Sequence, residues 1–151
     1  MNDIGIDYLS FDNDIKFAAK TDKVVIKPLV ELDDKMFNDV IEGNIKFVNI
    51  SQNFVAPKKI HTRQRNCFYK LDDTDIDGTF DLIILDGPNG NGRSIAFNVM
   101  KHHIKDVSFI FIDDYNHYPF IDDMCRVFNN VTLVKSHTED NDVWEIYKIE
   151  K

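Results

Sequence analysis

Two apolar runs that each end in carboxylates most limit how this chain of 151 residues can fold. The first run spans 80–85 and ends at Asp86, directly before a glycine-rich stretch. The second spans 107–112 and ends at Asp113 and Asp114. A helical pattern separates the runs, so together they predict a βαβ unit with two buried parallel strands. Because ligands of open α/β sheets bind beyond the carboxyl ends of the strands, these aspartates are expected at one site.

The composition is typical of one globular domain over residues 1–151. The formal net charge is −8, which predicts that neither nucleic acid nor an anionic membrane is a main partner. No apolar run approaches the ~18 residues that span a membrane. The two cysteines lack metal-ligand spacing, which indicates reduced thiols in a cytoplasmic protein. A short basic cluster is expected to be a solvated loop: Lys58, Lys59, His61, Arg63 and Arg65.

Hydrophobic periodicity and turn residues predict the secondary structure. The continuously apolar segment 82–85 is expected to be a central strand covered on both faces. Ser94 is expected to cap the helix that follows it, and 136–142 to form a polar turn. Strands are expected over 4–11, 23–29, 45–50, 82–85, 109–112, 131–134 and 143–149, and helices over 32–41, 95–100 and 120–128.

The order of elements from 80 to 150 resembles the C-terminal half of the class I S-adenosylmethionine-dependent methyltransferase fold. The segment FDLIILDGP (80–88) resembles the strand-four motif of that family, SFIFIDDYNHY (108–118) the strand-five motif, and YLSFDND (8–14) the end of strand two. The resemblance implies an α/β fold with a three-layer, Rossmann-like, mostly parallel sheet that ends in an antiparallel strand pair. The glycine-rich loop after the family's strand one has no counterpart, so the expected fold is shortened at its N-terminus.

The IDDYN element and the acidic end of the preceding strand are most similar to metal-dependent sugar O-methyltransferases of the macrocin type. The resemblance implies S-adenosylmethionine and Mg²⁺, or another divalent cation, as cofactors. It implies Asp86, Asp113 and Asp114 as metal ligands, Asp12 on the cofactor ribose, and Asp86 and Gly87 beside the cofactor. The implied substrate is the hydroxyl group of a small acceptor such as a sugar.

Three further residues near these motifs are candidates for roles at the site. His117 is a candidate general base for the acceptor hydroxyl, and Arg93 and Tyr115 are candidates for contacts with the substrate. Each has a structural alternative: a solvated histidine, a surface arginine and a packing tyrosine. Asp113 or Asp114 could likewise cap the helix that follows.

Two other functions compete with methyl transfer. The stretch Gly87–Ser94 has the spacing of a phosphate-binding loop with Arg93 in place of lysine, which would make the chain a nucleotide-binding protein. Alternatively, the chain is a non-catalytic binding or assembly protein. In that case the sheet edge left open by the missing strand one would favour a dimer or another homo-oligomer.

Overall fold

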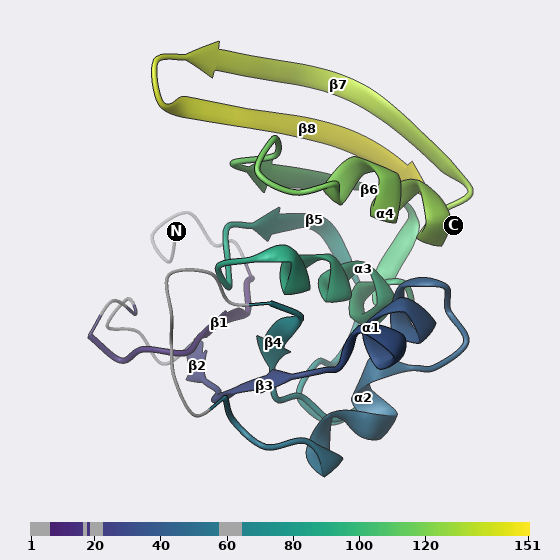
Figure 1. Ribbon diagram of the computed structural model, residues 1–151. Coiled ribbons are helices and arrows are strands. Elements are labelled where there is room, and N and C mark those ends of the chain that lie inside the picture. Colours follow the sequence, from purple (N-terminus) through teal and green to yellow (C-terminus); the bar gives the residue numbers. More distant parts are fainter. Residues whose placement is uncertain (1–6, 17, 19–22, 58–64) are drawn as a thin grey trace.

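The computed structural model describes residues 7–16, 18, 23–57 and 65–151 (Figure 1). They form a mixed α/β structure. Its strands are β1 (Ser10–Asp12), β2 (Val24–Ile26), β3 (Leu29–Glu31), β4 (Cys67–Tyr69), β5 (Phe80–Leu85), β6 (Ile104–Asp113), β7 (Asn130–Glu139) and β8 (Asp142–Glu150). Its helices are α1 (Asp34–Ile41), α2 (Phe47–Ile50), α3 (Ile95–Met100) and α4 (Phe120–Val127), with 3₁₀ turns η2 (Ser51–Asn53) and η3 (Asn91–Ser94).

The main sheet has four strands in the order β5-β6-β8-β7. β5 and β6 are parallel and are connected through α3, as the two apolar runs predict. β8 runs antiparallel to both β6 and β7. Elsewhere in the described part of the chain, β1 and β2 form a parallel pair and β3 and β4 an antiparallel pair. The pairing is therefore mixed rather than mostly parallel, because a tight turn between β7 and β8 can connect only antiparallel strands.

The two faces of the main sheet differ in their cover. Helices α3 and α4 lie on the same side of this sheet (Figure 1), where Ile110, Ile112 and Ile149 are completely buried. On the opposite face Leu82 is 52% and Ile84 58% exposed. The expectation that β5 is covered on both faces is wrong for the described residues, and a three-layer arrangement is not found in them.

The helical layer is held together by Asn98 of α3. Its side-chain oxygen accepts a hydrogen bond from the backbone N–H of Phe47, and its amide group donates to the carbonyl oxygens of Val40 and Ile45. This contact from a distant part of the sequence satisfies an N–H at the start of α2. The strand expected over 45–50 is therefore wrong, because a tertiary contact stabilises a helix there.

Asp33 begins α1, where its carboxylate accepts a hydrogen bond from the N–H of Met36. Gly43, with φ +79°, follows the helix as expected. Two other local predictions need correction. The hydroxyl of Ser94 does not cap α3 but donates to the buried Asp123 carboxylate at 2.7 Å. Strand β7 continues to Glu139, because a short turn at 140–141 replaces the longer polar turn.

The run expected over 23–29 is divided into β2 and β3, and Pro28 lies between them. β1 overlaps the strand expected over 4–11 only at 10 and 11, and 4–6 lie outside the described residues. The basic cluster lies largely outside them as well, although Arg65 is exposed and bonded to Asp34. None of the helices in the described segments is long and apolar enough to cross a membrane.

Candidate functional site

The parallel register of β5 and β6 brings two of the predicted carboxylates together. Leu85 pairs with Ile112, so Asp86 and Asp113 follow at the same end of neighbouring strands. Their carboxyl groups lie close enough to interact. Partial loss of hydration and then the Asp113 carboxyl raise the pKa of Asp86, and the positive charge of Arg93 opposes this rise. Two acids that share one location in this way attract a proton or a metal cation.

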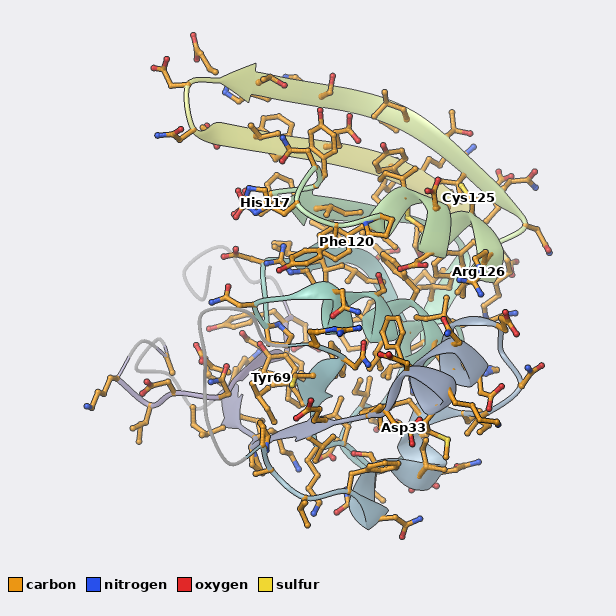
Figure 2. All side chains as sticks on the ribbon, in the orientation of Figure 1. Asp33, Tyr69, His117, Phe120, Cys125 and Arg126 are labelled. Carbon is orange, nitrogen blue, oxygen red and sulfur yellow. The ribbon has the colours of Figure 1, made fainter. Side chains whose placement is uncertain are left out.

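Asp114 lies next to this pair but adopts a different backbone conformation. Its φ of +52° is left-handed, and its N–H donates to the carbonyl oxygen of Val143. The Asp114 carboxylate lies 3.9 Å from Nδ1 of His117, whose side chain is 60% exposed. Figure 2 shows His117 in the segment between β6 and α4. The alternative in which Asp113 or Asp114 caps α4 is wrong, because α4 begins at Phe120 after Pro119.

Arg93 is buried, with 4% of its surface exposed. Its Nη1 donates to the backbone oxygen of Asp113 at 2.7 Å, and its Nε donates to that of Pro88 at 3.3 Å. The guanidinium carbon lies 5.3 Å from the centre of the Phe120 ring. Both of these hydrogen bonds of Arg93 go to the protein backbone, and the structural alternative of a surface arginine is wrong.

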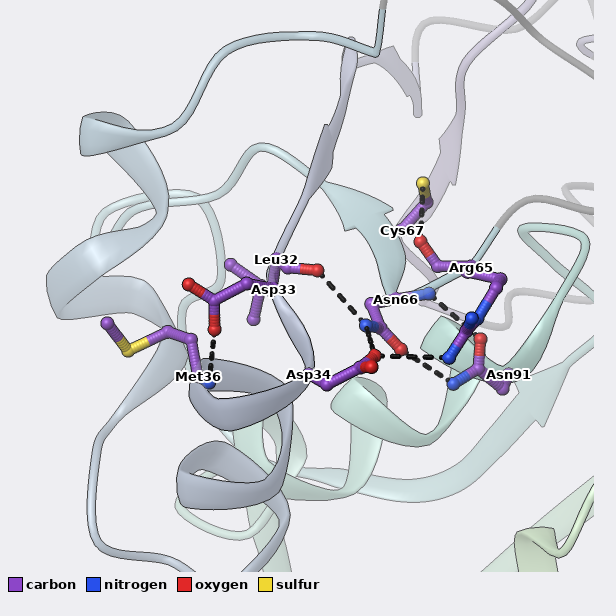
Figure 3. A network of polar contacts seen from close by, with 8 residues as sticks. All are labelled: Leu32, Asp33, Asp34, Met36, Arg65, Asn66, Cys67 and Asn91. Carbon is purple, nitrogen blue, oxygen red and sulfur yellow. Dashed lines mark hydrogen bonds and ion pairs between the residues drawn. The ribbon is translucent and has the colours of Figure 1, made fainter.

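The loop between β5 and α3 is fastened to the N-terminal half of the chain (Figure 3). Asn66, which is buried and left-handed at φ 54°, exchanges two 2.8 Å hydrogen bonds with Asn91. The Asn66 amide also donates to the oxygen of Leu32 and to the Asp34 carboxylate. A Cβ atom on Gly92 would lie 2.0 Å from a backbone oxygen of Cys67, so only glycine fits there. The loop is therefore held against Asn66 and Cys67, and Asn66 is in turn bonded to the segment that leads into α1.

These contacts bear on the phosphate-loop alternative. The motif requires the loop backbone and the side chains at 93 and 94 to face a phosphate. Here Arg93 contacts backbone oxygens, Ser94 contacts Asp123, and Gly92 packs against Cys67. The groups that would bind a phosphate already bind protein atoms, so the geometry does not favour this alternative.

Tyr69 of β4, which sequence patterns did not identify, is buried within electrostatic range of Asp12, Asp86 and Arg93. Burial, and after it the charge of Asp12, raises the pKa of Tyr69 to about 12, and the charges of Arg93 and Asp86 also act on it. A Cβ atom on Gly87 would lie 3.0 Å from the Tyr69 hydroxyl oxygen. Asp12 itself accepts a hydrogen bond from the N–H of Asp14. The sequence contains one weak signal for this neighbour of the site, a tyrosine in the short apolar run that forms β4.

A second acidic group lies beside Asp113 and Asp114. The turn between β7 and β8 and the end of β6 surround an open depression of about 680 Å³, lined by Asp113, Asp114, Glu139, Asp140, Asn141 and Asp142. Trp144 pairs with Asp113 across the β6–β8 ladder, and its ring stacks on His137 at a centroid distance of 5.2 Å. The sequence did not predict the hairpin's contribution, because the hairpin joins the site only through the antiparallel pairing.

Tyr115, expected to contact the substrate, is half-buried and packs against the core.

Two carboxylates fit one class of metal ion. Mg²⁺ is usually bound by one or two carboxylates and by several waters. Asp86 and Asp113 can supply the two carboxylates. In the described part of the chain no three side chains of the types His, Cys, Asp and Glu converge closely enough to form a complete metal cage. The donor set is thus suited to a hydrated Mg²⁺ or Mn²⁺ ion rather than to a closed structural metal such as zinc.

Comparisons with known proteins add no family to this geometry. No protein-family model matches the chain, and no curated protein or solved structure matches it at a significant level.

Proposed function

We propose that the protein is a methyltransferase-like enzyme that transfers a methyl group from S-adenosylmethionine to a hydroxyl of a small acceptor such as a sugar, assisted by a divalent cation. The observation that carries this proposal is that the β5–β6 register places Asp86 and Asp113, which interact, at adjacent carboxyl ends of the two strands. The order of strand, helix, strand, helix and hairpin from β5 to β8 supports it, because the family resemblance implies that order.

In this proposal each residue of the site has a distinct role. Asp86 and Asp113 hold the cation, which when bound would orient an acceptor hydroxyl and lower its pKa. His117 accepts the hydroxyl proton. Asp12 binds the ribose of the cofactor and Gly87 allows its close approach. Arg93 supports the site from inside rather than contacting the substrate.

A calorimetric titration with S-adenosylmethionine and Mg²⁺, and a separate one with ATP and Mg²⁺, tests the cofactor. Saturable binding of S-adenosylmethionine is expected. Binding of ATP alone would instead support a nucleotide site at Gly87–Ser94. Binding of neither would favour the non-catalytic alternative, for which an obligate dimer in a solution mass measurement is the next test.

A pair of variants tests the role of the cation. Asp113→Asn is expected to abolish the Mg²⁺-dependent part of cofactor binding and turnover while leaving the fold intact by circular dichroism. Asp73→Asn, which changes an exposed carboxylate in the segment after β4, is the matched control and should have no effect. Unchanged metal dependence in Asp113→Asn would contradict the proposed mechanism.

A further inference from the structure

Tyr69 of β4 combines a buried ring with an unbonded hydroxyl group (Figure 2). Only 9% of its surface is exposed. The ring packs against Phe11 at a centroid distance of 6.2 Å and against Phe68 at 5.2 Å. Within the described residues the hydroxyl has no hydrogen-bond partner, although the hydroxyl of a buried tyrosine usually finds one.

The hydroxyl group of Tyr69 is open to solvent even though the ring is buried. In the described part of the chain, every side-chain oxygen or nitrogen of a non-exposed residue that is closed off from water has a hydrogen-bond partner. The Tyr69 oxygen has none, so water must reach it. A polar atom that a buried ring holds in one position and that no protein group occupies can bind a ligand.

Two contacts connect Tyr69 to the segments that carry Asp12 and Asp86. Phe11, whose ring packs on that of Tyr69, directly precedes Asp12 in β1. At the other end of the side chain, a Cβ atom on Gly87 would lie 3.0 Å from the hydroxyl oxygen, and Gly87 directly follows Asp86. The lack of a side chain at Gly87 therefore keeps this approach to the hydroxyl open.

The surroundings of the hydroxyl restrict the group that a ligand can present to it. Burial, and after it the charge of Asp12, raises the pKa of Tyr69, so the hydroxyl keeps its proton at neutral pH. Asp12 and Asp86 together outweigh the single charge of Arg93 and disfavour an anion. A metal cation would satisfy the carboxylates but cannot accept the phenol proton. A ligand hydroxyl does both, because it accepts from the phenol and donates to a carboxylate.

We propose that the hydroxyl group of Tyr69 binds a hydroxyl group of a sugar, held beside Asp12 and Gly87. Tyr69 is thus a ligand-binding residue whose hydroxyl serves binding and not the fold. The inference deepens the proposed function and rests on it for the source of the sugar, which is either the ribose of S-adenosylmethionine or the acceptor. Both sources present the same chemistry, and the experiment separates them.

A comparison of two buried tyrosines tests whether the fold uses the Tyr69 hydroxyl. Tyr147 of β8 is 6% exposed, and its hydroxyl donates to the Glu145 carboxylate. Tyr147→Phe should lower the Tm, because it removes this bond from a buried carboxylate. Tyr69→Phe keeps the ring and removes no hydrogen bond among the described residues, so its Tm should equal or exceed that of wild type. A Tm that falls as far in Tyr69→Phe as in Tyr147→Phe would overturn the inference.

Calorimetric titration measures what the Tyr69 hydroxyl binds. S-adenosylhomocysteine carries the ribose of the cofactor without a transferable methyl group, and methyl β-D-glucopyranoside represents a neutral acceptor sugar. Tyr69→Phe should bind at least one of these two probes about five- to tenfold more weakly than wild type, as expected for the loss of one hydrogen bond. A loss confined to S-adenosylhomocysteine identifies the cofactor ribose, and a loss confined to the glucoside identifies the acceptor. Tyr147→Phe should bind both probes with wild-type affinity.

Deoxy forms of the probe that responds separate a direct contact from an indirect effect. For S-adenosylhomocysteine this is the 2′,3′-dideoxyribose form, and for the glucoside it is the set of single deoxy forms. Wild type and Tyr69→Phe should bind the form that lacks the contacted hydroxyl equally well, because neither protein can make the bond. A loss in Tyr69→Phe that persists with every deoxy form would show that the substitution changes the shape of the site, and the inference would be wrong.

The outcomes distinguish this inference from the proposed function. If wild type binds S-adenosylmethionine with Mg²⁺ and Tyr69→Phe weakens the binding of neither probe, the inference fails and the proposed function stands. If wild type does not bind S-adenosylmethionine but Tyr69→Phe weakens the binding of the glucoside, the inference holds and the proposed function fails. If wild type binds none of these ligands, both fail.

Discussion

The two faces of the main sheet are made of the same strands but have different surroundings. On the face beneath α3 and α4, Ile110, Ile112 and Ile149 are completely buried. On the other face, Ile84 is 58% and Phe109 39% exposed. Both faces are apolar in sequence. The comparison teaches that a continuous apolar run identifies a strand of the sheet interior but does not establish that a second layer covers it.

The candidate site draws on both faces. Side chains alternate along a strand, so Asp113 lies on the same face of β6 as Phe109 and Phe111. Arg93, which holds the backbone of Asp113, is buried in the helical layer on the opposite side. The carboxylates thus extend from a rigid, covered support toward an open surface, which gives a ligand access to a fixed site.

The largest effect is expected from removing apolar volume under the helices. Ile110→Ala should reduce the free energy of unfolding by about 3–4 kcal/mol, because it leaves a cavity in a fully buried position. Urea unfolding followed by circular dichroism measures the change. The matched control is Ile84→Ala on the open face, expected to cost less than about 1 kcal/mol. Equal costs for both variants would break the comparison and mean that the second face is covered in solution.

The next effect concerns the attachment of the site loop to β4. In Gly92→Ala the new Cβ would overlap the backbone of Cys67, so the loop or the strand must move, at a cost of about 2–3 kcal/mol. The shift in Tm measures this cost. Gly78→Ala is the control: Gly78 is left-handed at φ +78°, unlike Gly92, but has free space around it, so the cost should be about 1 kcal/mol. A Gly92→Ala protein as stable as wild type would show that this contact does not hold the loop.

A smaller, pH-dependent effect is expected where η3 meets α4. Burial raises the pKa of Asp123 and the Ser94 hydroxyl lowers it, so Ser94→Ala should raise it further. An aspartate whose pKa is raised by folding contributes its full stabilisation at pH values below its pKa in the unfolded chain, about 3.9. That stabilisation is lost as the pH rises through its pKa in the folded protein. Ser94→Ala should therefore cost about 1–2 kcal/mol at pH 7 and less near pH 4. Urea unfolding at both pH values checks this, and a cost that does not change with pH would contradict it.

The smallest effect lies at the exposed end of the sheet. The raised pKa of Asp86 means that its charged form opposes folding above that pKa. Asp86→Asn should raise the Tm by about 2 °C at pH 7, and the gain should disappear in acid. Added Mg²⁺ should stabilise wild type and not the variant. A variant less stable than wild type at pH 7 without metal would show that the Asp86 carboxylate has a favourable partner.

The sequence predicts the C-terminal half of the fold better than the N-terminal half. From β5 to β8 the strands are six to ten residues long. Over that length the apolar pattern outweighs the conformational preferences of individual residues. Strands β1 to β4 have three residues each and pair only with one another among the described residues. Elements this short are determined by tertiary contacts, as the four-residue helix α2 is by its hydrogen bond to Asn98. Patterns in a single sequence do not contain such contacts.

At the site, the sequence predicts the residues that follow the ends of the parallel strands and not those that other segments of the chain contribute. Asp86 and Asp113 follow from the βαβ pattern alone. Tyr69 comes from a separate strand pair, and the carboxylates of 139–142 come from the hairpin. The burial of Arg93 could not be predicted either, because its partners are backbone oxygens of Pro88 and Asp113, which carry no sequence signal.

The reciprocal bond between Asn66 and Asn91 has a consequence for the chemical ageing of the protein. Asn89 and Asn91 are each followed by glycine, the sequence in which asparagine most readily cyclises and deamidates. The Asn91 amide is held at both its oxygen and its nitrogen, which prevents the rotation that cyclisation requires, whereas Asn89 is exposed. Peptide mapping after long incubation should therefore find aspartate at 89 well before 91, and each such conversion would add a negative charge to the loop that leads from Asp86.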